Sequence, residues 1–350
     1  MWESSLRELQ SRYGPTIDAE LRRSLGRDSD LTFFRGMMGY QLGYLDQRLN
    51  PVTAPSGKRF RSSLCLLACE GAGGDTRDAL HAAVAIELLH NFSLIHDDIE
   101  DGDVVRRHRP TVWRVWGEPH AINVGDGMFA LAHRTILRAT GPGDTAREVS
   151  TAFMDMALAL TEGQYMDMSF ETRSNVSSAE YLEMISRKTA ALIRFSAWAG
   201  ASLGGASSTA RDGFSEYGVH LGTAFQIHDD VMGVWGVEAV TGKQAAQDLH
   251  KRKKTLPLLI AIERGSASQR RDLDAFLSRS VDDIRPVLDI LSSTGAEKIA
   301  RETISDHVAR ALHALDCASV KDPERSLLES LTRDLTSQRL ETNADTVTKA

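Results

Sequence analysis

The strongest constraint on the fold of this chain is a helical repeat of apolar residues that runs through most of its length. In residues 78–98, "DALHAAVAIELLHNFSLIHDD", apolar side chains recur at Leu80, Val84, Leu88 and Ile95. A spacing of three or four residues places such side chains on one face of an α-helix. Strand-like alternation of apolar and polar residues is nearly absent from the sequence. These patterns predict an all-α protein.

Only short runs of turn residues interrupt the helical segments, and the sequence has no fixed-period repeat. We predict about a dozen helices in one domain, residues 1–340, because none of the breaks is long enough to be a domain linker. Asp75 and Asp144 each follow a glycine-rich turn, so both are expected to cap the helices that begin there. Residues 341–350 are polar, and we expect them to form a flexible tail.

Length, charge and cysteine content argue against several classes of protein. The chain has 350 residues and a formal net charge of -7, whereas a nucleic-acid binder usually carries a basic face. Cys65 and Cys69 lie one helical turn apart in an apolar run, which predicts buried thiols rather than a disulfide framework. No apolar stretch reaches the roughly 18 residues of a membrane span, and the polar N-terminus does not resemble a secretory signal. We expect a soluble, cytoplasmic protein.

Three aspartates, Asp97, Asp98 and Asp101, lie at the C-terminal end of the long helix predicted around residues 78–98. Asp97 and Asp101 are four residues apart, so on a helix they share a face and repel each other. The helix dipole also disfavours anions at this end. Either the cluster is a solvated helix end, or a bound cation compensates both penalties. Mg²⁺ is a cation of the required kind, because it prefers carboxylate oxygens and often shares substrate phosphates.

A second aspartate pair favours the bound cation. Asp229 and Asp230 lie near the end of another long apolar helical pattern, residues 217–236. Two such helices could face each other across a cavity, with carboxylates on both walls and apolar residues below them. This arrangement would hold a metal-bridged anion above an apolar pocket.

Basic residues near both clusters indicate that the anion is a phosphate, because the planar guanidinium of arginine and the point charge of lysine both suit phosphate oxygens. They are Lys58, Arg59 and Arg61 in "GKRFR", Arg106 and Arg107 after the first cluster, Lys188 in "RKTA", and Lys243, Lys253 and Lys254 after the second. The histidines have no partner at zinc-site spacing, and the glycine-rich segments lack the spacing of a nucleotide-binding loop.

Five separated motifs resemble, in the same order, those of the trans-isoprenyl diphosphate synthases, the polyprenyl synthetase family. They are "GKRFR", "LLHNFSLIHDDIED" followed by "RR", "RKTA", "FQIHDD", and "TGK" with "DLHKRKKTLP". The resemblance covers roughly residues 30–320. It implies an antiparallel helical barrel around a deep central cavity, usually a homodimer, with three Mg²⁺ ions per active site. The implied reaction condenses isopentenyl diphosphate with an allylic diphosphate.

The resemblance also implies roles for individual residues. Metal would be bound by Asp97, Asp98 and Asp101 on one helix and by Asp229 and Asp230 on the opposite one. Substrate contacts would come from Arg106, Lys188 and Lys243 on the allylic diphosphate, from Lys58, Arg61, His90 and Arg107 on isopentenyl diphosphate, and from Lys253 in the motif that closes the site. Thr189 and Gln226 would line the region where the carbocation develops.

One position departs from the family pattern. The second motif is usually D-D-x-x-D, whereas Gly233 stands here in the last place of "DDVMG". A carboxylate near one metal is therefore missing, and metal affinity could be weaker. Two alternatives to a synthase follow, a terpene cyclase on the same scaffold and a non-catalytic subunit of a heteromeric synthase. The retention of "GKRFR" and His90 argues against the cyclase, and the intact "DDIED", "RR" and "RKTA" argue against the non-catalytic subunit.

Product length is expected to depend on the residues below the first aspartate cluster. Phe92 stands five residues before Asp97, on a face of the helix from which it could form the cavity floor; an ordinary core phenylalanine is the other interpretation. In the family, one aromatic residue there with a small neighbour, here Ser93, resembles short-chain synthases. We expect geranylgeranyl diphosphate as the product, with farnesyl diphosphate as the alternative.

Overall fold

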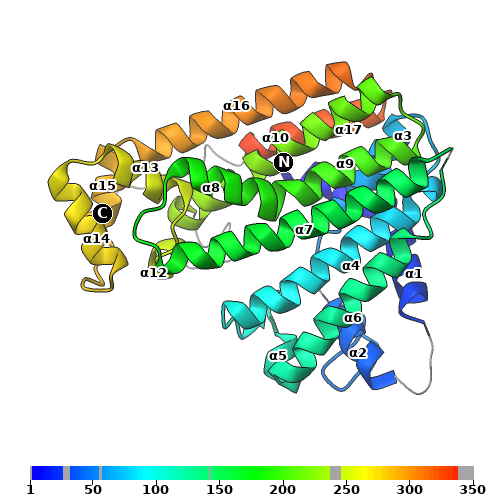
Figure 1. The fold of residues 1–350 in the computed structure, drawn as a ribbon, viewed down its shortest axis with the longest axis horizontal. Helices are drawn as coiled ribbons and strands as arrows, with labels where there is room; N and C mark the ends of the chain where they lie inside the picture. Colours follow the sequence, from blue (N-terminus) through cyan, green and yellow to red (C-terminus); the bar gives the residue numbers. More distant parts are fainter. Residues whose placement is uncertain (1, 27–31, 55–56, 142, 237–245, 338–350) are drawn as a thin grey trace.

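The computed structural model describes residues 2–26, 32–54, 57–141, 143–236 and 246–337, and it confirms the all-α class (Figure 1). The first half contains α1 (Trp2–Leu25), α2 (Thr32–Gln41), α3 (Phe60–Gly71), α4 (Thr76–Glu100), β1 (Val105–Arg106), β2 (Arg109–Pro110), α5 (Val112–Trp116), α6 (Glu118–Ile136) and α7 (Thr145–Thr172). The second half contains α8 (Ser178–Ile185), η2 (Ser186–Ala190), α9 (Ala191–Leu203), α10 (Ser208–Trp235), α12 (Gln247–His250), α13 (Leu256–Arg264), α14 (Ala267–Leu277), α15 (Arg285–Ser293), α16 (Ala296–Cys317) and α17 (Glu324–Ser337). The predicted end of the domain at 340 and the predicted tail lie outside the described residues.

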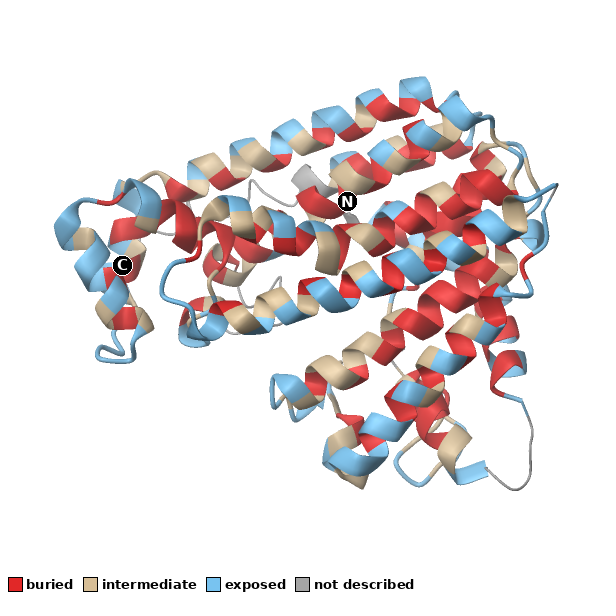
Figure 2. Ribbon diagram, in the orientation of Figure 1, coloured by how far each residue is buried: buried red, intermediate tan, exposed pale blue. Residues whose placement is uncertain are grey.

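The long helices lie side by side in a bundle (Figure 1). α10 packs between α9 and α16, α3 packs against α4 and α9, and α6 covers α4. One apolar core joins α1 to α7, α9, the first half of α10, the end of α16 and α17. A second joins α8, the latter half of α10, α12 to α15 and the first part of α16. Buried residues dominate α3 and α9, whereas α7 and α16 alternate buried and exposed faces (Figure 2). Within the described ranges, no helix is both long and apolar enough to span a bilayer.

The central helices approach each other closely where the sequence is rich in small residues. A Cβ atom on Gly200 of α9 would overlap the carbonyl oxygen of Cys65 on α3, and one on Gly204 would lie 2.5 Å from the carbonyl oxygen of Cys69. Only glycine allows such an approach of two backbones. The two cysteines are free thiols and are fully buried, as predicted.

The predicted N-caps have different outcomes. Asp75 begins α4 with a reciprocal capping box, in which its carboxylate accepts from the Arg77 amide at 2.9 Å and the Asp78 carboxylate accepts from the Asp75 amide at 3.3 Å. Asp144 stands at the N-cap of α7, as predicted, but its carboxylate accepts no capping hydrogen bond there. α4 therefore has a well-defined start, which fixes the phase of the helix that carries the first aspartate cluster.

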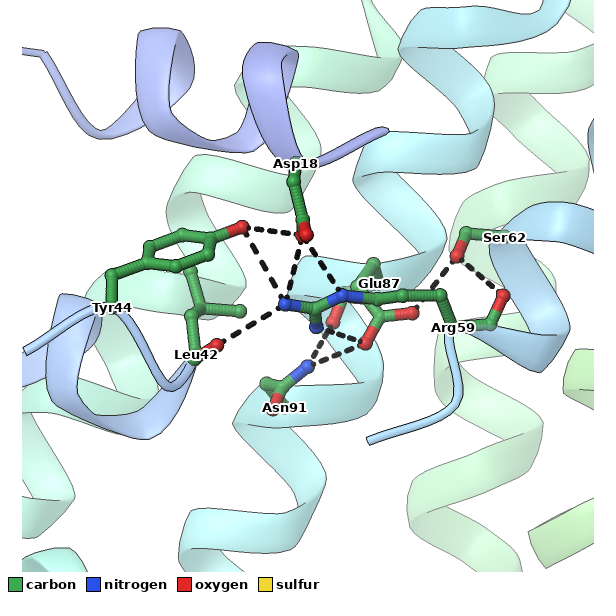
Figure 3. A network of polar contacts seen from close by, with 7 residues as sticks. All are labelled: Asp18, Leu42, Tyr44, Arg59, Ser62, Glu87 and Asn91. Atoms are coloured by element: carbon green, nitrogen blue, oxygen red, sulfur yellow. Dashed lines mark hydrogen bonds and ion pairs between the residues drawn. The ribbon is translucent and has the colours of Figure 1, made fainter. Parts of the chain in front are cut away.

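Arg59 connects four parts of the fold through one buried guanidinium (Figure 3). Its Nη1 donates to Glu87 Oε1 of α4 at 2.7 Å, its Nε donates to Asp18 of α1 at 3.1 Å, and its Nη2 donates to the Leu42 carbonyl at 3.1 Å. The side chains of Arg59 and Glu87 are only 1% and 3% exposed. Arg59 itself begins α3 with a left-handed φ of 49°.

Both carboxylate oxygens of Glu87 accept hydrogen bonds within this network. Its second oxygen accepts from Ser62 Oγ at 3.0 Å, and Asn91 Nδ2 donates to Oε1 at 3.0 Å. Burial raises the pKa of Glu87, but the charges of Arg59 and His90 and the hydrogen bonds outweigh burial and lower the pKa to about 2. The carboxylate is therefore ionised at neutral pH.

Removing Arg59 should be strongly destabilising, because Glu87 would be left as a buried charge without its main partner. We expect Arg59→Met to lower the free energy of unfolding by about 3–5 kcal/mol. Urea or guanidinium unfolding would measure the change. Arg59→Met combined with Glu87→Leu should cost less than Arg59→Met alone, because the double variant buries no charge. An equal or larger loss in the double variant would contradict this account.

Candidate active site

The first aspartate cluster lies at the C-terminal end of α4, and its members differ in their surroundings. Asp98 is buried, and its Oδ1 accepts from Arg106 Nε at 2.5 Å. Its Oδ2 has no hydrogen-bond partner among the described residues. Asp97 is partly exposed and Asp101 is exposed. Asp97 and Asp101 are thus open to a ligand, whereas Asp98 also holds Arg106 in place.

Electrostatics around this cluster disfavour three simultaneous charges. Burial raises the pKa of Asp97 to about 6, against the attraction of Lys188, and the charge of Asp101 raises it further. Burial likewise raises the pKa of Asp98 to about 6, although Arg106 opposes the shift. A cation bound beside these carboxylates would relieve both effects.

A two-residue hairpin presents the paired arginines. β1 and β2 are antiparallel, and the turn residues Arg107 and His108 both have left-handed φ values, 52° and 61°. This is the backbone of a type I′ turn, whose twist matches that of the flanking strands. Arg106 therefore points to Asp98, while the Arg107 guanidinium lies against the backbone of Gly57, where a Cβ atom would come within 2.6 Å of Nη2.

Arg107 belongs to a basic cluster with Arg61 and His90. Burial lowers the pKa of Arg61 to about 10, with Glu87 opposing and Arg107 adding to the shift. Burial and the charge of Arg61 lower the pKa of His90 well below its usual value. No carboxylate forms an ion pair with Arg61 or Arg107 in the described ranges, and Arg61 Nε has no hydrogen-bond partner there. Because Glu87 is already held by Arg59, this cluster has an excess of positive charge that suits an anion.

The second aspartate pair lies on α10, and its two members also differ. Asp229 is exposed, whereas Asp230 is 2% exposed. Asp230 accepts hydrogen bonds from the Tyr181 hydroxyl, from Gln226 Nε2 at 3.1 Å and from the Leu256 amide at 3.4 Å. Burial raises its pKa to about 7. Asp229 is thus available for a ligand, while Asp230 joins α8, α10 and α13.

Thr189 and Gln226 form a polar chain that ends at Asp230. Thr189 Oγ1 donates to Gln226 Oε1 at 2.8 Å, and Gln226 donates in turn to Asp230. The structure therefore brings together Thr189 and Gln226, which the sequence placed in the same region. Their dipoles are held in one orientation by a buried carboxylate.

The short π-helical segment η2 carries Lys188 beside an aspartate that sequence reasoning missed. Lys188 Nζ donates to Asp167 Oδ2 of α7 at 2.5 Å. α7 and η2 touch at Gly163, where a Cβ atom would lie 2.7 Å from Lys188 Cα. π-helical turns occur frequently at functional sites. Asp167 lies on a predicted helix outside the five motifs, so the motif comparison did not mark it.

Lys253 joins the two acidic walls electrostatically. Its Nζ lies 3.7 Å from Asp167 Oδ2. Burial lowers the pKa of Lys253, but the combined charges of Asp167, Asp230, Asp248 and Asp101 raise it above its usual value. Aspartates from both walls thus act on one ammonium group. Lys254 has a different function, because it donates to the carbonyls of Phe170 and Arg173 at 2.5 and 2.8 Å and so caps α7.

Three other predicted residues have different outcomes. Lys58 is exposed beside the start of α3, near the basic cluster. Phe92 is buried below the first aspartates and packs against Phe129 of α6, with ring centroids 4.9 Å apart. Lys243 lies outside the described residues.

The accessible acidic groups are of the kind that bind Mg²⁺, but further ligands would be needed to complete a site. No three histidine, cysteine or acidic side chains in the described part of the chain lie close enough to hold a metal by themselves. Mg²⁺ commonly binds one or two carboxylates and completes its shell with phosphate oxygens and water. Asp97 and Asp101 on α4 and Asp229 on α10 are accessible donors of this kind.

Comparison with known proteins identifies the family of the chain. The Polyprenyl synthetase family matches residues 43–292. A (2E,6E)-farnesyl diphosphate synthase of Mycobacterium tuberculosis is 39% identical over 85% of this chain and 84% of its own length. A geranylgeranyl diphosphate synthase of the same bacterium is 36% identical over 84% of this chain and 85% of its own. The crystal structure of a geranylgeranyl pyrophosphate synthetase from Pyrococcus horikoshii superposes with a TM-score of 0.84, at 31% identity, over 97% of this chain and 99% of that one.

The fold and these similarities indicate a transferase of the all-α isoprenoid synthase type. The chain belongs to the polyprenyl synthetase family. Prenyl transfer between diphosphate substrates is the activity that this membership supports.

Proposed function

We propose that the protein condenses isopentenyl diphosphate with an allylic diphosphate, head to tail and in the trans configuration, to a short-chain product. The observation that carries the proposal is the presence of two differently charged clusters of residues. One consists of carboxylates on α4 and α10 with Lys188 and Lys253, and suits a metal-bound diphosphate. The other is the basic cluster of Arg61, His90 and Arg107, which suits a second diphosphate without metal.

Mg²⁺ is the metal proposed for the first site, with three ions expected from the family. Asp97, Asp101 and Asp229 would hold it, and the predicted contribution of Asp98 and Asp230 stays a prediction, because hydrogen bonds already occupy part of each carboxylate. When bound, the metal neutralises charge on the departing pyrophosphate.

The residues of the chain would support each step of the transfer. Lys188 and Lys253 stabilise the negative charge that grows on the leaving oxygen as the allylic C–O bond breaks. The fixed dipoles of Thr189 and Gln226 face the developing carbocation. The double bond of isopentenyl diphosphate, held by the basic cluster, then forms the new C–C bond. The proton lost from the adduct goes to the released pyrophosphate, and apolar walls keep water from the carbocation.

The basic cluster also favours a synthase over a terpene cyclase. A cyclase ionises one diphosphate and needs no second cationic site. Here Gly57 leaves space for Arg107, and Glu87 forms its ion pair with Arg59 rather than with Arg61 or Arg107. These are features of a site that is maintained for a second anion.

Geranylgeranyl diphosphate is the product that we propose, with farnesyl diphosphate as the alternative. Phe92 is supported by a row of rings, Phe129, His133 and Phe153, with successive centroids 4.9, 4.1 and 5.4 Å apart. Such a backed aromatic floor would limit the length of the chain in the cavity. The relatives include both farnesyl and geranylgeranyl synthases, which agrees with a short-chain product.

We further propose that the protein is a homodimer formed through α7. An apolar stripe follows the outer face of this helix, and Leu158 and Tyr165 are 60% and 74% exposed. Met154 and Met168 extend the stripe at helical spacing. A second copy would cover it. A cytoplasmic location stays a prediction from the sequence.

The reaction can be tested with purified protein, Mg²⁺, isopentenyl diphosphate and, in turn, dimethylallyl, geranyl and farnesyl diphosphate. We expect a C20 alcohol after dephosphorylation with each primer, detected by mass spectrometry. Asp97→Ala should lower turnover at least about 100-fold while the fold is retained, because a metal-binding carboxylate is lost. A cyclic hydrocarbon made without isopentenyl diphosphate would identify a cyclase, and the absence of product would indicate a subunit that needs a partner.

Phe92→Ala should lengthen the product, because the floor of the cavity would be removed. With farnesyl diphosphate as primer, we expect products longer than C20 by mass spectrometry. Phe276→Leu is a matched control, since Phe276 is a buried phenylalanine of α14. An unchanged product length in Phe92→Ala would make Phe92 an ordinary core residue.

Leu158→Glu should shift the protein from dimer to monomer, because it places a charge in the proposed interface. Sedimentation velocity at several protein concentrations would measure the shift. Val281→Glu changes another exposed apolar residue, on the loop before α15, and should leave the dimer intact. A monomeric wild-type protein would refute the proposal directly.

A further inference from the structure

The space beside Gly233, the last position of the second aspartate motif, is filled by a carboxylate from another helix. A Cβ atom on Gly233 would overlap Oδ2 of Asp248 and lie 2.5 Å from its Cγ. Asp248 belongs to α12, which packs against the end of α10. Its carboxylate therefore occupies the space that the side chain of residue 233 would fill in the D-D-x-x-D pattern.

The location of this space matters for the metal-facing side of α10. Gly233 follows Asp229 by four residues, so on the helix the two positions share a face. Asp229 is exposed on that face and is the member of the pair that is open to a ligand. A carboxylate beside Gly233 thus stands one helical turn from Asp229, where the last aspartate of the motif would stand.

Neighbouring contacts place α12 at the same site. The Asp248 carbonyl accepts from the Lys253 amide at 2.9 Å, which closes the turn that carries Lys253 towards Asp167. Lys251, just after α12, donates to Asp103 Oδ1 at 2.9 Å, beyond the end of α4. Burial chiefly raises the pKa of Asp230, and the charge of Asp248 adds to the shift, so the two carboxylates lie within electrostatic reach of each other.

We propose that Asp248 supplies the acidic wall of α10 with the carboxylate that position 233 lacks, and that Gly233 is required because any side chain there would displace it. This inference rests on the proposed function, since it concerns the metal and diphosphate of that reaction. Gly233 is then one half of a coupled pair and no mark of an inactive subunit. The charge of the wall is maintained, although it comes from a different element.

The coupling can be tested by exchanging the two residues. Asp248→Ala removes the carboxylate, and Gly233→Asp forces two carboxylates into one space. The double variant, Gly233→Asp with Asp248→Ala, rebuilds the carboxylate on α10 itself. Gly233→Ala is a milder variant in case Gly233→Asp does not fold, and Asp274→Ala on α14 is a control for loss of an exposed aspartate.

The readout is binding of inorganic pyrophosphate by isothermal titration calorimetry over a series of Mg²⁺ concentrations, with thermal melting as a check on folding. We expect each single variant at 233 or 248 to weaken Mg²⁺-dependent binding about 10- to 100-fold, the range for residues that support a metal site. The double variant should recover most of the wild-type affinity, a rescue that a merely structural effect would not produce.

Two results would overturn the inference. One is an Asp248→Ala protein whose pyrophosphate binding depends on Mg²⁺ as in the wild type. The other is a double variant whose loss of affinity equals the sum of the losses in the two single variants. Turnover of wild-type protein, measured in parallel, separates this question from the reaction itself. If the wild-type protein turns over substrate but Asp248→Ala binds pyrophosphate as the wild type does, only the role of Asp248 is refuted. If Asp248→Ala weakens pyrophosphate binding but the wild-type protein shows no turnover, the role of Asp248 is supported and the proposed reaction is refuted.

Discussion

The buried ion pair between Arg59 and Glu87 is the interaction on which the rest of the site depends. It joins the start of α3 to α4, and it holds both to α1 and to the segment after α2. The ion pair also leaves the cations Arg61 and Arg107 without a carboxylate partner among the described residues. Glu87 attracts Arg61 and Arg107 electrostatically, and without Arg59 it would be their natural counter-ion. By binding Glu87, Arg59 leaves a positive charge excess for a ligand.

The two halves of the site carry opposite charges, and in both halves burial disfavours the charged forms. Burial moves Asp97 and Asp98 towards their neutral forms, and it does the same for Arg61, His90 and Arg107. A ligand of the opposite charge restores the ionised form in each half. Binding of such ligands would therefore be favoured by relief of this repulsion and desolvation.

The sequence was sufficient for the helical class, because this class depends on local periodicity, and it placed the two aspartate pairs near the ends of long helices. It could not separate Asp97 from Asp98 or Asp229 from Asp230, since adjacent residues on a helix differ by about 100° in direction and only their neighbours reveal which one is occupied. Here the hydrogen bonds from Arg106 to Asp98 and from Tyr181 to Asp230 show which aspartate of each pair is occupied. Asp167 and Asp248 were missed for a related reason. Each makes contacts with an element that is distant in the chain, and the pattern of a single segment does not reveal such contacts.

The π-helical turn Ser186–Ala190 also solves a problem of phase. α8 on one side of it contributes Tyr181 and Met184 to one apolar core, whereas α9 on the other side contributes Leu192 and Ile193 to the other core. A wider turn adds residues without adding length, so the two helices can continue along one line while their apolar faces point in different directions. The widened turn also places Lys188 and Thr189 where the cores meet. This local irregularity in the backbone thereby changes the direction of the apolar face between α8 and α9. It also leaves polar side chains at the boundary between the two cores.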